Sequence, residues 1–214
     1  MNSIKLSLFD IFGYTLPGLF ILIGILILSD KSLQSLVDAI NVFKNINLPI
    51  GILIILIAYV LGFSFDSPGS WYYYKIGCKI FKDPKKETRS RFNFNREKEH
   101  EMLVMVRDKS PINNEMLQTW KLLKTMSHNL SFSFLLIVII SLVKILFFIV
   151  KNPIEWYILS GFCFILSIIL LYRAIVFESW FYNHLVNTAR ALNFAKLNDI
   201  AKKEKGEINI ESSH

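Results

Sequence analysis

Three ionisable residues lie at the ends of long apolar stretches, where a charged group is costly unless it is paired or hydrated. Asp10 precedes the first apolar stretch, Asp66 follows the second, and Arg173 follows the fourth. If the stretches cross a membrane up and down, these three positions share one depth, so either aspartate can pair with Arg173. The sequence therefore predicts a charge clamp that fixes the helix bundle, and a proton or ion relay is the alternative.

Lys144 carries a charge well inside the third apolar stretch. It lies about 9 Å from the outer end of the helix predicted there, at about 1.5 Å per residue. Its long stem can bring the ammonium group to the membrane surface, which is the interpretation we favour. In the alternative interpretation, several copies of this helix surround an aqueous path, and Lys144 lines a pore that favours anions.

A basic stretch between residues 82 and 96 is interleaved with aromatic residues near its end. Basic side chains contact the phosphates of anionic lipids or nucleic acids, and aromatic rings stack on unpaired bases. We expect a loop that contacts anionic lipid headgroups, with RNA or a partner protein as alternatives. The residues concerned are Lys82, Lys85, Lys86, Arg89, Arg91, Phe92 and Phe94.

Small residues in the first apolar stretch predict close helix packing. Pro17 predicts a bend because it removes a backbone donor and clashes with the preceding turn. Gly13 and Gly18 leave room for another helix, and Gly62 in the second stretch can supply the matching surface. A gating hinge is the alternative role for these residues.

The chain contains no recognisable catalytic or cofactor motif. Its sequence lacks a glycine-rich phosphate loop, His-Glu-x-x-His, Gly-x-Ser-x-Gly and a Cys-x-x-Cys pair. Arg96 and His100 resemble the Arg-x4-6-His site of HEPN ribonucleases, but their spacing is one residue short. Cys78 and Cys163 do not indicate a disulfide framework or a metal site. We therefore predict a protein that is not an enzyme and that has no catalytic residues, cofactor or metal.

Four apolar stretches set the class of the protein. Of its 214 residues, 53% are hydrophobic, and the mean hydropathy is +0.42, which is typical of an integral membrane protein. Each stretch is rich in Ile, Leu and Phe on all sides and reaches roughly 25–30 Å as a helix, enough to cross a bilayer. The predicted transmembrane helices cover about residues 11–29, 48–65, 132–150 and 154–172.

The distribution of basic residues predicts how these helices are oriented. Of 24 Lys and Arg residues, Lys31, Lys44 and Lys151 lie in the two short loops and Lys144 lies within a span, which leaves 20 on the other side. Because cytoplasmic segments carry such an excess, we predict a membrane protein with cytoplasmic N- and C-termini. Trp156 then belongs to an interfacial aromatic belt, together with Tyr157.

The outer loop between the first two spans shows a helical pattern. Apolar residues recur there at three- and four-residue steps, which predicts a short helix on the outer surface of the membrane. These residues are Leu33, Leu36, Val37, Ile40 and Phe43.

The polar segments predict additional helices outside the membrane. Residues 71–81 continue the second span, a break follows at Asp83, and a helix over 97–109 carries an apolar face. Ser110 and Pro111 offer an N-cap and a first helical residue, so another helix starts there and runs into the third span. The apolar faces must pack on each other, on the tail or on another copy.

The complete prediction is an all-α integral membrane protein with four transmembrane helices and a helical cytosolic region. After Arg173 the helical pattern continues, and from Lys202 the chain is small, charged and polar, which predicts disorder. The parts are a transmembrane hairpin (1–67), a cytosolic helical segment (68–131), a second hairpin (132–172), a tail helix (173–201) and a disordered tail (202–214).

Three short patterns are similar to those of small four-span bacterial inner-membrane proteins of antiviral defence loci. They are Gly13-Tyr14-x-x-Pro17-Gly18, Ala58-Tyr59-x-x-Gly62, and the helix from Tyr172-Arg173 to Arg190-Ala191-Leu192-Asn193-Phe194. The chain resembles the membrane accessory proteins of type VI-B CRISPR systems first, and the membrane subunit of the Kiwa system second.

The resemblance implies an oligomeric component that perturbs the membrane, or forms a pore in it, when a cytosolic defence protein signals. A non-conducting anchor or sensor that recruits a cytosolic nuclease is the alternative. The partners implied are the lipid bilayer, further copies of the chain and a cytosolic defence protein, with nucleic acid less favoured.

Overall fold

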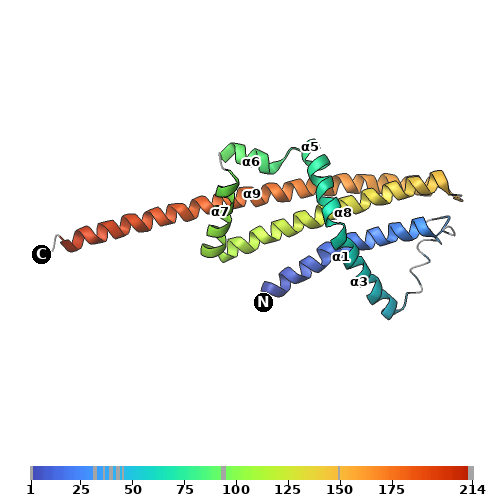
Figure 1. Ribbon diagram of the computed structural model, residues 1–214, viewed down its shortest axis with the longest axis horizontal. Helices are drawn as coiled ribbons and strands as arrows, with labels where there is room; N and C mark the ends of the chain where they lie inside the picture. The colour runs from blue at the N-terminus through green and yellow to red at the C-terminus, as the bar shows by residue number, and fades with distance from the viewer. Residues whose placement is uncertain are drawn as a thin grey trace. The chain divides into compact units, whose positions relative to one another are not determined.

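The computed structural model of the chain describes residues 2–30, 33–35, 37, 38, 41, 44, 46–92, 95–148 and 150–211, with side chains from residue 11 to residue 193. The described residues are 91% helical and contain no strand (Figure 1). The predicted all-α class is therefore confirmed. The elements are α1 (Asn2–Ser29), α3 (Leu48–Ser64), α4 (Asp66–Tyr72), the π-helical turn η1 (Tyr73–Gly77), α5 (Cys78–Ile80), α6 (Pro84–Phe92), α7 (Arg96–Lys109), α8 (Pro111–Phe147) and α9 (Pro153–Glu211).

Three of the described helices are long and apolar enough to span a membrane. They contain the segments Ile11–Ser29, Pro111–Phe147 and Pro153–Asn193. The second predicted span differs, because α3 ends at Ser64 and the chain bends by 45° before Asp66–Ile80. Counted as one broken helix, this bent pair is a fourth candidate span.

The bend after α3 has a local cause in the sequence. Pro68 lacks the N–H that would bond the carbonyl of Ser64, so the α-helical hydrogen-bond ladder cannot continue through this position. Phe65 adopts φ −90° and ψ 2°, and the Ser64 hydroxyl bonds back to the Val60 carbonyl at 2.8 Å. The helix expected over 48–65 is observed as α3, and the expectation that residues 71–81 simply continue it is corrected by the bend.

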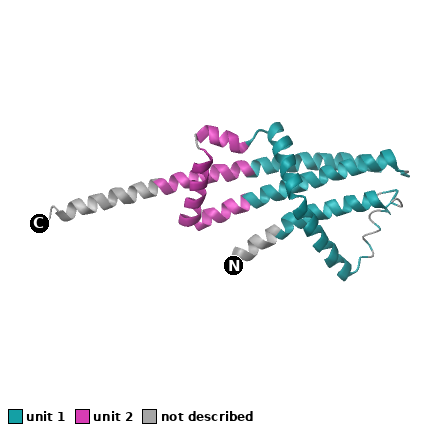
Figure 2. Cartoon of the chain, viewed as in Figure 1, with its two compact units in different colours: residues 1–83, 121–177 teal, residues 84–120, 178–214 magenta. Residues whose placement is uncertain are grey.

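The chain divides into two compact units (Figure 2). Unit 1 consists of Met1–Asp83 and Lys121–Phe177, and unit 2 consists of Pro84–Trp120 and Glu178–His214. The boundaries fall inside α8 and α9, so each of these long helices contributes to both units.

In unit 1, α1 and α3 touch at glycines. A Cβ atom added to Gly18 would overlap the carbonyl of Ala58, and one added to Gly62 would overlap the carbonyl of Tyr14. The Tyr14 ring packs edge-on against Phe63, with centroids 5.6 Å apart. The predicted close approach at Gly18 and Gly62 is therefore confirmed. Pro17 lies inside α1, and its side chain is fully buried.

Also in unit 1, α8 and α9 form the antiparallel hairpin that their short connection predicts. The hydroxyl of Ser131 donates to the carbonyl of Ser167 at 2.7 Å, and the hydroxyl of Ser167 donates to the carbonyl of Ser131 at 2.8 Å. Further along the pair, Ile137, Val138 and Cys163 form a buried apolar cluster. The two helices are therefore joined by serine hydrogen bonds at Ser131 and Ser167, and by apolar packing around Val138.

In unit 2, the apolar face predicted for residues 97–109 is buried against α8 and α9. Val106 packs with Leu117, Leu185 and Ala189, and Met102 and Leu103 lie against this cluster. Asn95 caps α7 by accepting a hydrogen bond from the Lys98 amide at 2.9 Å. The amphipathic helix therefore packs on the tail helix, which was one of the expected solutions.

The basic stretch is a helix rather than the expected loop. Residues Pro84–Phe92 form α6, which begins with a proline in its first turn. Lysine, arginine and glutamate are good helix formers, so the charge of this stretch favours a helix rather than opposing it. Phe94 lies outside the described residues.

The tail also differs from the expectation of disorder after Lys202. Helix α9 continues to Glu211. Residues 201–205 are alanine, lysine and glutamate, which are good helix formers and favour this continuation. Residues 212–214 lie outside the described residues.

The aromatic residues and the helix predicted for the outer face are observed only in part. Trp156 is fully buried and donates its indole N–H to the carbonyl of Gln34 at 3.4 Å, so it does not belong to an interfacial belt, whereas Tyr157 is exposed. A helix over the outer loop is only partly described. Val37 is helical there, and Leu36, Ile40 and Phe43 lie outside the described residues.

Candidate functional site

A polar cluster forms in unit 1 where the chain bends after α3. Asn129 of α8 donates to the Asp66 carboxylate at 2.8 Å. His128 Nε2 lies 3.3 Å from the Ser70 hydroxyl and 4.0 Å from the same carboxylate. Because Asp66 and Ser70 both lie on α4, the cluster ties the bent segment to α8.

Two atoms of this cluster are buried without a protein partner. They are His128 Nδ1 and Asn129 Oδ1, and both residues are only 3% exposed. The Asn129 oxygen lies against Gly69, where an added Cβ would collide with it. A side chain at position 69 would therefore require the Asn129 side chain to move from its present position.

Asp66, His128 and Ser70 are the residue types of a hydrolase triad, but their arrangement is different. In such a triad the carboxylate bonds one ring nitrogen of the histidine and the nucleophile bonds the other. Here both Asp66 and Ser70 lie on the Nε2 side, and Nδ1 has no partner among the described residues. The geometry therefore supports a structural joint rather than nucleophilic catalysis.

The predicted charge clamp is not formed between Asp66 and Arg173. The bend at Phe65 turns Asp66 toward α8, where it meets Asn129 and His128. The guanidinium of Arg173 lies over the ring of Phe177, 5.0 Å from its centroid. The side chain of Asp10 lies outside the described residues.

The side chain of Lys144 is fully buried within the chain, and its ammonium group reaches the end of α1. Its ammonium group donates to the carbonyls of Ile27 and Asp30, both at 2.7 Å. The rings of Phe148 and Trp156 lie 5.5 Å and 5.9 Å from it. The last carbonyls of a helix have no partner within the helix and carry partial negative charge, so a buried cation there caps α1.

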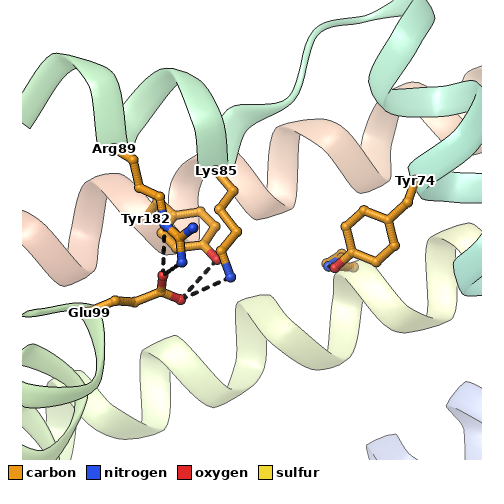
Figure 3. Close-up of polar contacts among 6 residues, drawn as sticks. Tyr74, Lys85, Arg89, Glu99 and Tyr182 are labelled. Atoms are coloured by element: carbon orange, nitrogen blue, oxygen red, sulfur yellow. Dashed lines mark hydrogen bonds and ion pairs between the residues drawn. The ribbon is translucent and has the colours of Figure 1, made fainter. Parts of the chain in front are cut away.

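A charge cluster around Glu99 holds unit 2 together (Figure 3). Arg89 donates two hydrogen bonds to the Glu99 carboxylate, from Nε at 3.2 Å and from Nη2. Lys85 lies 3.3 Å from the other carboxylate oxygen, to which the Tyr182 hydroxyl donates at 3.2 Å. The cluster therefore joins α6, α7 and α9.

The surroundings of Glu99 keep it charged. Burial raises the pKa of its carboxyl, but the hydrogen bond from Arg89 and the positive charge of Lys85 outweigh burial and hold the pKa below its ordinary value of 4.5. Glu99 itself is 9% exposed. The donors around this buried carboxylate satisfy its hydrogen-bonding capacity. Their contacts hold α6 against α7 and α9.

Next to this cluster, unit 2 has a groove of about 310 Å³. Its apolar lining comes mainly from α7 and α9, and charged groups stand at its rim. The Arg190 guanidinium lies 4.5 Å from the centre of the Phe92 ring, which fixes its position. The lining residues are Phe92, Lys98, Glu101, Met102, Met105, Val186, Ala189, Arg190 and Asn193.

The basic stretch splits into an inward and an outward set. Lys85 and Arg89 point to Glu99, so they are not available as a headgroup contact. Lys82, Lys86 and Arg91 are exposed, and Arg91 lies over the Phe92 ring at 5.3 Å. Sequence reasoning missed Glu99, although Lys85 and Arg89, one helical turn apart, require an acidic partner if α6 packs.

Comparison with known proteins adds no identification. No protein family, no curated protein and no solved structure matches the chain.

Proposed function

We propose that the chain is a four-span integral protein of the bacterial inner membrane with cytoplasmic termini. Its function is that of a non-conducting anchor whose unit 2 docks a cytosolic partner. Three long apolar helices, the bent fourth segment and the excess of basic residues on one side support the membrane placement.

The observation that carries the non-conducting function is the position of Lys144. It is fully buried and bound to the carbonyls of Ile27, in the last turn of α1, and of Asp30, just after it, so it does not offer a charge to an aqueous path. Ile137, Val138 and Cys163 fill the interior of unit 1 on the same helix pair. A bundle that is closed in this way fits an anchor better than a channel.

The observation that supports docking is the groove of unit 2. Glu99 and its partners fix the helices around it, so the surface is formed before a partner binds. Met102 and Met105 supply the adaptable apolar contacts that binding grooves use.

Reconstituted vesicles test conduction directly. We expect the purified chain to leave ion and dye retention unchanged, and the Lys144→Glu variant to lose folded yield without creating a current. A channel-forming peptide in the same vesicles is the positive control. Ion flux that changes its anion preference with Lys144→Glu would contradict the proposal and favour the pore.

Site-specific cross-linking in cells tests docking by the full chain. A photoreactive residue replaces Met105 in the groove or, as the control, Ile112, which is 82% exposed in the same unit and does not line the groove. We expect a discrete protein adduct at Met105 that Arg190→Glu removes, and no such adduct at Ile112. Equal labelling at both positions would argue against a docking groove.

The sequence resemblance supports antiviral defence as the setting of this function. Infection of cells with and without the gene tests it. A plaque count that does not depend on the gene would contradict a role in antiviral defence. It would not affect the anchor function, which the vesicle and cross-linking experiments test separately.

A further inference from the structure

The segment after the bend has one anchored face and one exposed face, and both belong to unit 1. On the anchored face, Tyr72 and Tyr73 are buried against Leu171, Ala174 and Ile175. The Tyr72 hydroxyl lies 3.3 Å from the Ser167 hydroxyl. The orientation of the helical segment about its own axis is therefore fixed by packing.

The exposed face carries aromatic and basic side chains. Trp71 is 61% exposed and Tyr74 is 49% exposed. Lys75, Lys79 and Lys82 are exposed as well, and none of the three makes an ion pair with a described residue. Trp71, Lys75 and Lys79 recur every four residues, so they lie along one side of the segment.

The geometry of the bend brings this face to the edge of a bilayer. The 17 residues of α3 reach about 26 Å, slightly less than the roughly 30 Å hydrocarbon core. The six residues from Asp66 to Trp71 add about 9 Å along their own axis, and the 45° bend reduces this to about 6 Å along α3. Trp71 therefore comes at the boundary between hydrocarbon and headgroups.

We propose that the exposed face of α4, η1 and α5 is a binding surface for anionic phospholipid headgroups. Trp71 places its ring at the boundary and its indole N–H in the headgroup layer. The hydroxyl of Tyr74 accepts a hydrogen bond from Lys124 at 3.0 Å, so Tyr74 contributes its exposed ring to this face. Lys75, Lys79 and Lys82 follow on the aqueous side, where each basic group near an anionic surface contributes about 1 kcal/mol. This inference rests on the membrane placement in the proposed function.

The surface replaces the headgroup contact that the sequence suggested for the whole basic stretch. Lys85 and Arg89 of that stretch are bound to Glu99. The lysines of residues 75–82 carry no such bond and follow an aromatic pair. Positive charge and interfacial aromatic residues are thus combined in this segment, which makes an anionic bilayer surface its best occupant.

Lipid selectivity of the reconstituted full chain tests the proposal. The measured quantity is the ratio of the association constants of spin-labelled phosphatidylglycerol and phosphatidylcholine at low salt. We expect a ratio above one for the wild type, a decrease of up to about fivefold for Lys75→Gln, and a ratio near one when Lys75, Lys79 and Lys82 are all replaced by glutamine. The matched control replaces the exposed Lys98, Lys109 and Lys121, which lie farther from the predicted spans, by glutamine and keeps the wild-type ratio.

A second measurement locates Trp71. Lipids brominated near the headgroup should quench its fluorescence, and Trp71→Phe should remove the quenched component. An unchanged lipid ratio in the triple variant, or a Trp71 signal that these lipids do not quench, would overturn the proposal. Binding of soluble RNA through the same lysines, as tight as binding to anionic vesicles, would overturn it too.

Failure of the membrane placement gives a different result. In that case the chain would not float with neutral phosphatidylcholine vesicles. A chain that floats with neutral vesicles and shows no preference for phosphatidylglycerol would overturn the headgroup surface alone.

Discussion

At the scale of single residues, the three best-defined polar contacts are all structural. Lys144 caps α1, Glu99 joins three helices, and Asp66 fixes the bend through Asn129. Lys144 and Glu99 are buried together with the partners that they need, which limits the cost of removing their charges from water, whereas Asp66 is partly exposed. These three charged groups therefore help to hold the helices together, although Glu99 was not singled out from the sequence.

Removing the Lys144 ammonium group should destabilise unit 1. In Lys144→Met the carbonyls of Ile27 and Asp30 lose a donor in a buried site, and we expect a loss of about 2–4 kcal/mol. Thermal unfolding in detergent measures the effect. The control Lys151→Met changes an exposed lysine near the same helix end and should stay within about 0.5 kcal/mol of the wild type. Equal stability of the two variants would argue against the cap.

Glu99 should make unit 2 sensitive to acid. Its pKa is lower in the folded chain than in the unfolded chain, so the stabilisation is complete above the unfolded value near 4.5. The stabilisation is lost as the pH falls through the lower folded value. We expect the thermal midpoint to fall with pH below about 4.5 in the wild type and to depend less on pH in Glu99→Gln. Glu87→Gln, an exposed residue of α6, should keep the wild-type pH dependence.

At the scale of elements, the sequence predicts what periodicity and small residues encode. The apolar stretches became α1, α8 and α9, and the face of Val106 packs as expected. Gly18 and Gly62, part of the resemblance to defence proteins, lie in the contact of α1 with α3. The packing of α1 on α3 therefore accounts for these two glycines.

What the sequence did not reveal depends on partners far apart along the chain. The bend itself could have been predicted, because Pro68 is four residues from Ser64. Three contacts could not have been predicted in this way. They join Lys144 to Asp30, Arg89 to Glu99 and Asp66 to Asn129. The spacing of Lys85 and Arg89 indicates that an acidic partner is needed, but which residue pairs with which depends on the helix faces that meet, and a single sequence does not specify them.

The contact of α1 with α3 gives a prediction with an internal control. Gly18→Ala should push the two helices apart, because its added methyl group would meet the backbone of Ala58, and we expect a loss of about 1–3 kcal/mol. At Gly13 the nearest atom to an added Cβ is the Met126 Cβ, at 4.0 Å, so Gly13→Ala should be neutral or stabilising. Unfolding of both variants in the same detergent compares them. Equal destabilisation would show that helix propensity, rather than close approach, determines the effect.

At the scale of the whole molecule, the open question is how many helices cross the membrane. Three candidate spans put the two termini on opposite sides, whereas counting the bent pair Leu48–Ser64 and Asp66–Ile80 as a span puts them on the same side. The excess of basic residues favours the second arrangement, because it leaves Lys31, Lys44 and Lys151 outside and 20 of 24 basic residues inside.

Cysteine labelling in intact cells separates these arrangements. With Cys78 and Cys163 replaced by serine, single cysteines are placed at Ser3, Lys44 and Ile112. Four spans predict that a membrane-impermeant maleimide labels the cysteine at position 44 in intact cells and those at positions 3 and 112 only after permeabilisation. If the bent pair does not cross the membrane, positions 44 and 112 lie on the same side. The maleimide would then label both of these cysteines, or neither of them, in intact cells. That result would leave α3 as a segment that enters and leaves on one face, and it would place the basic face of residues 71–82 on the side of the outer loop.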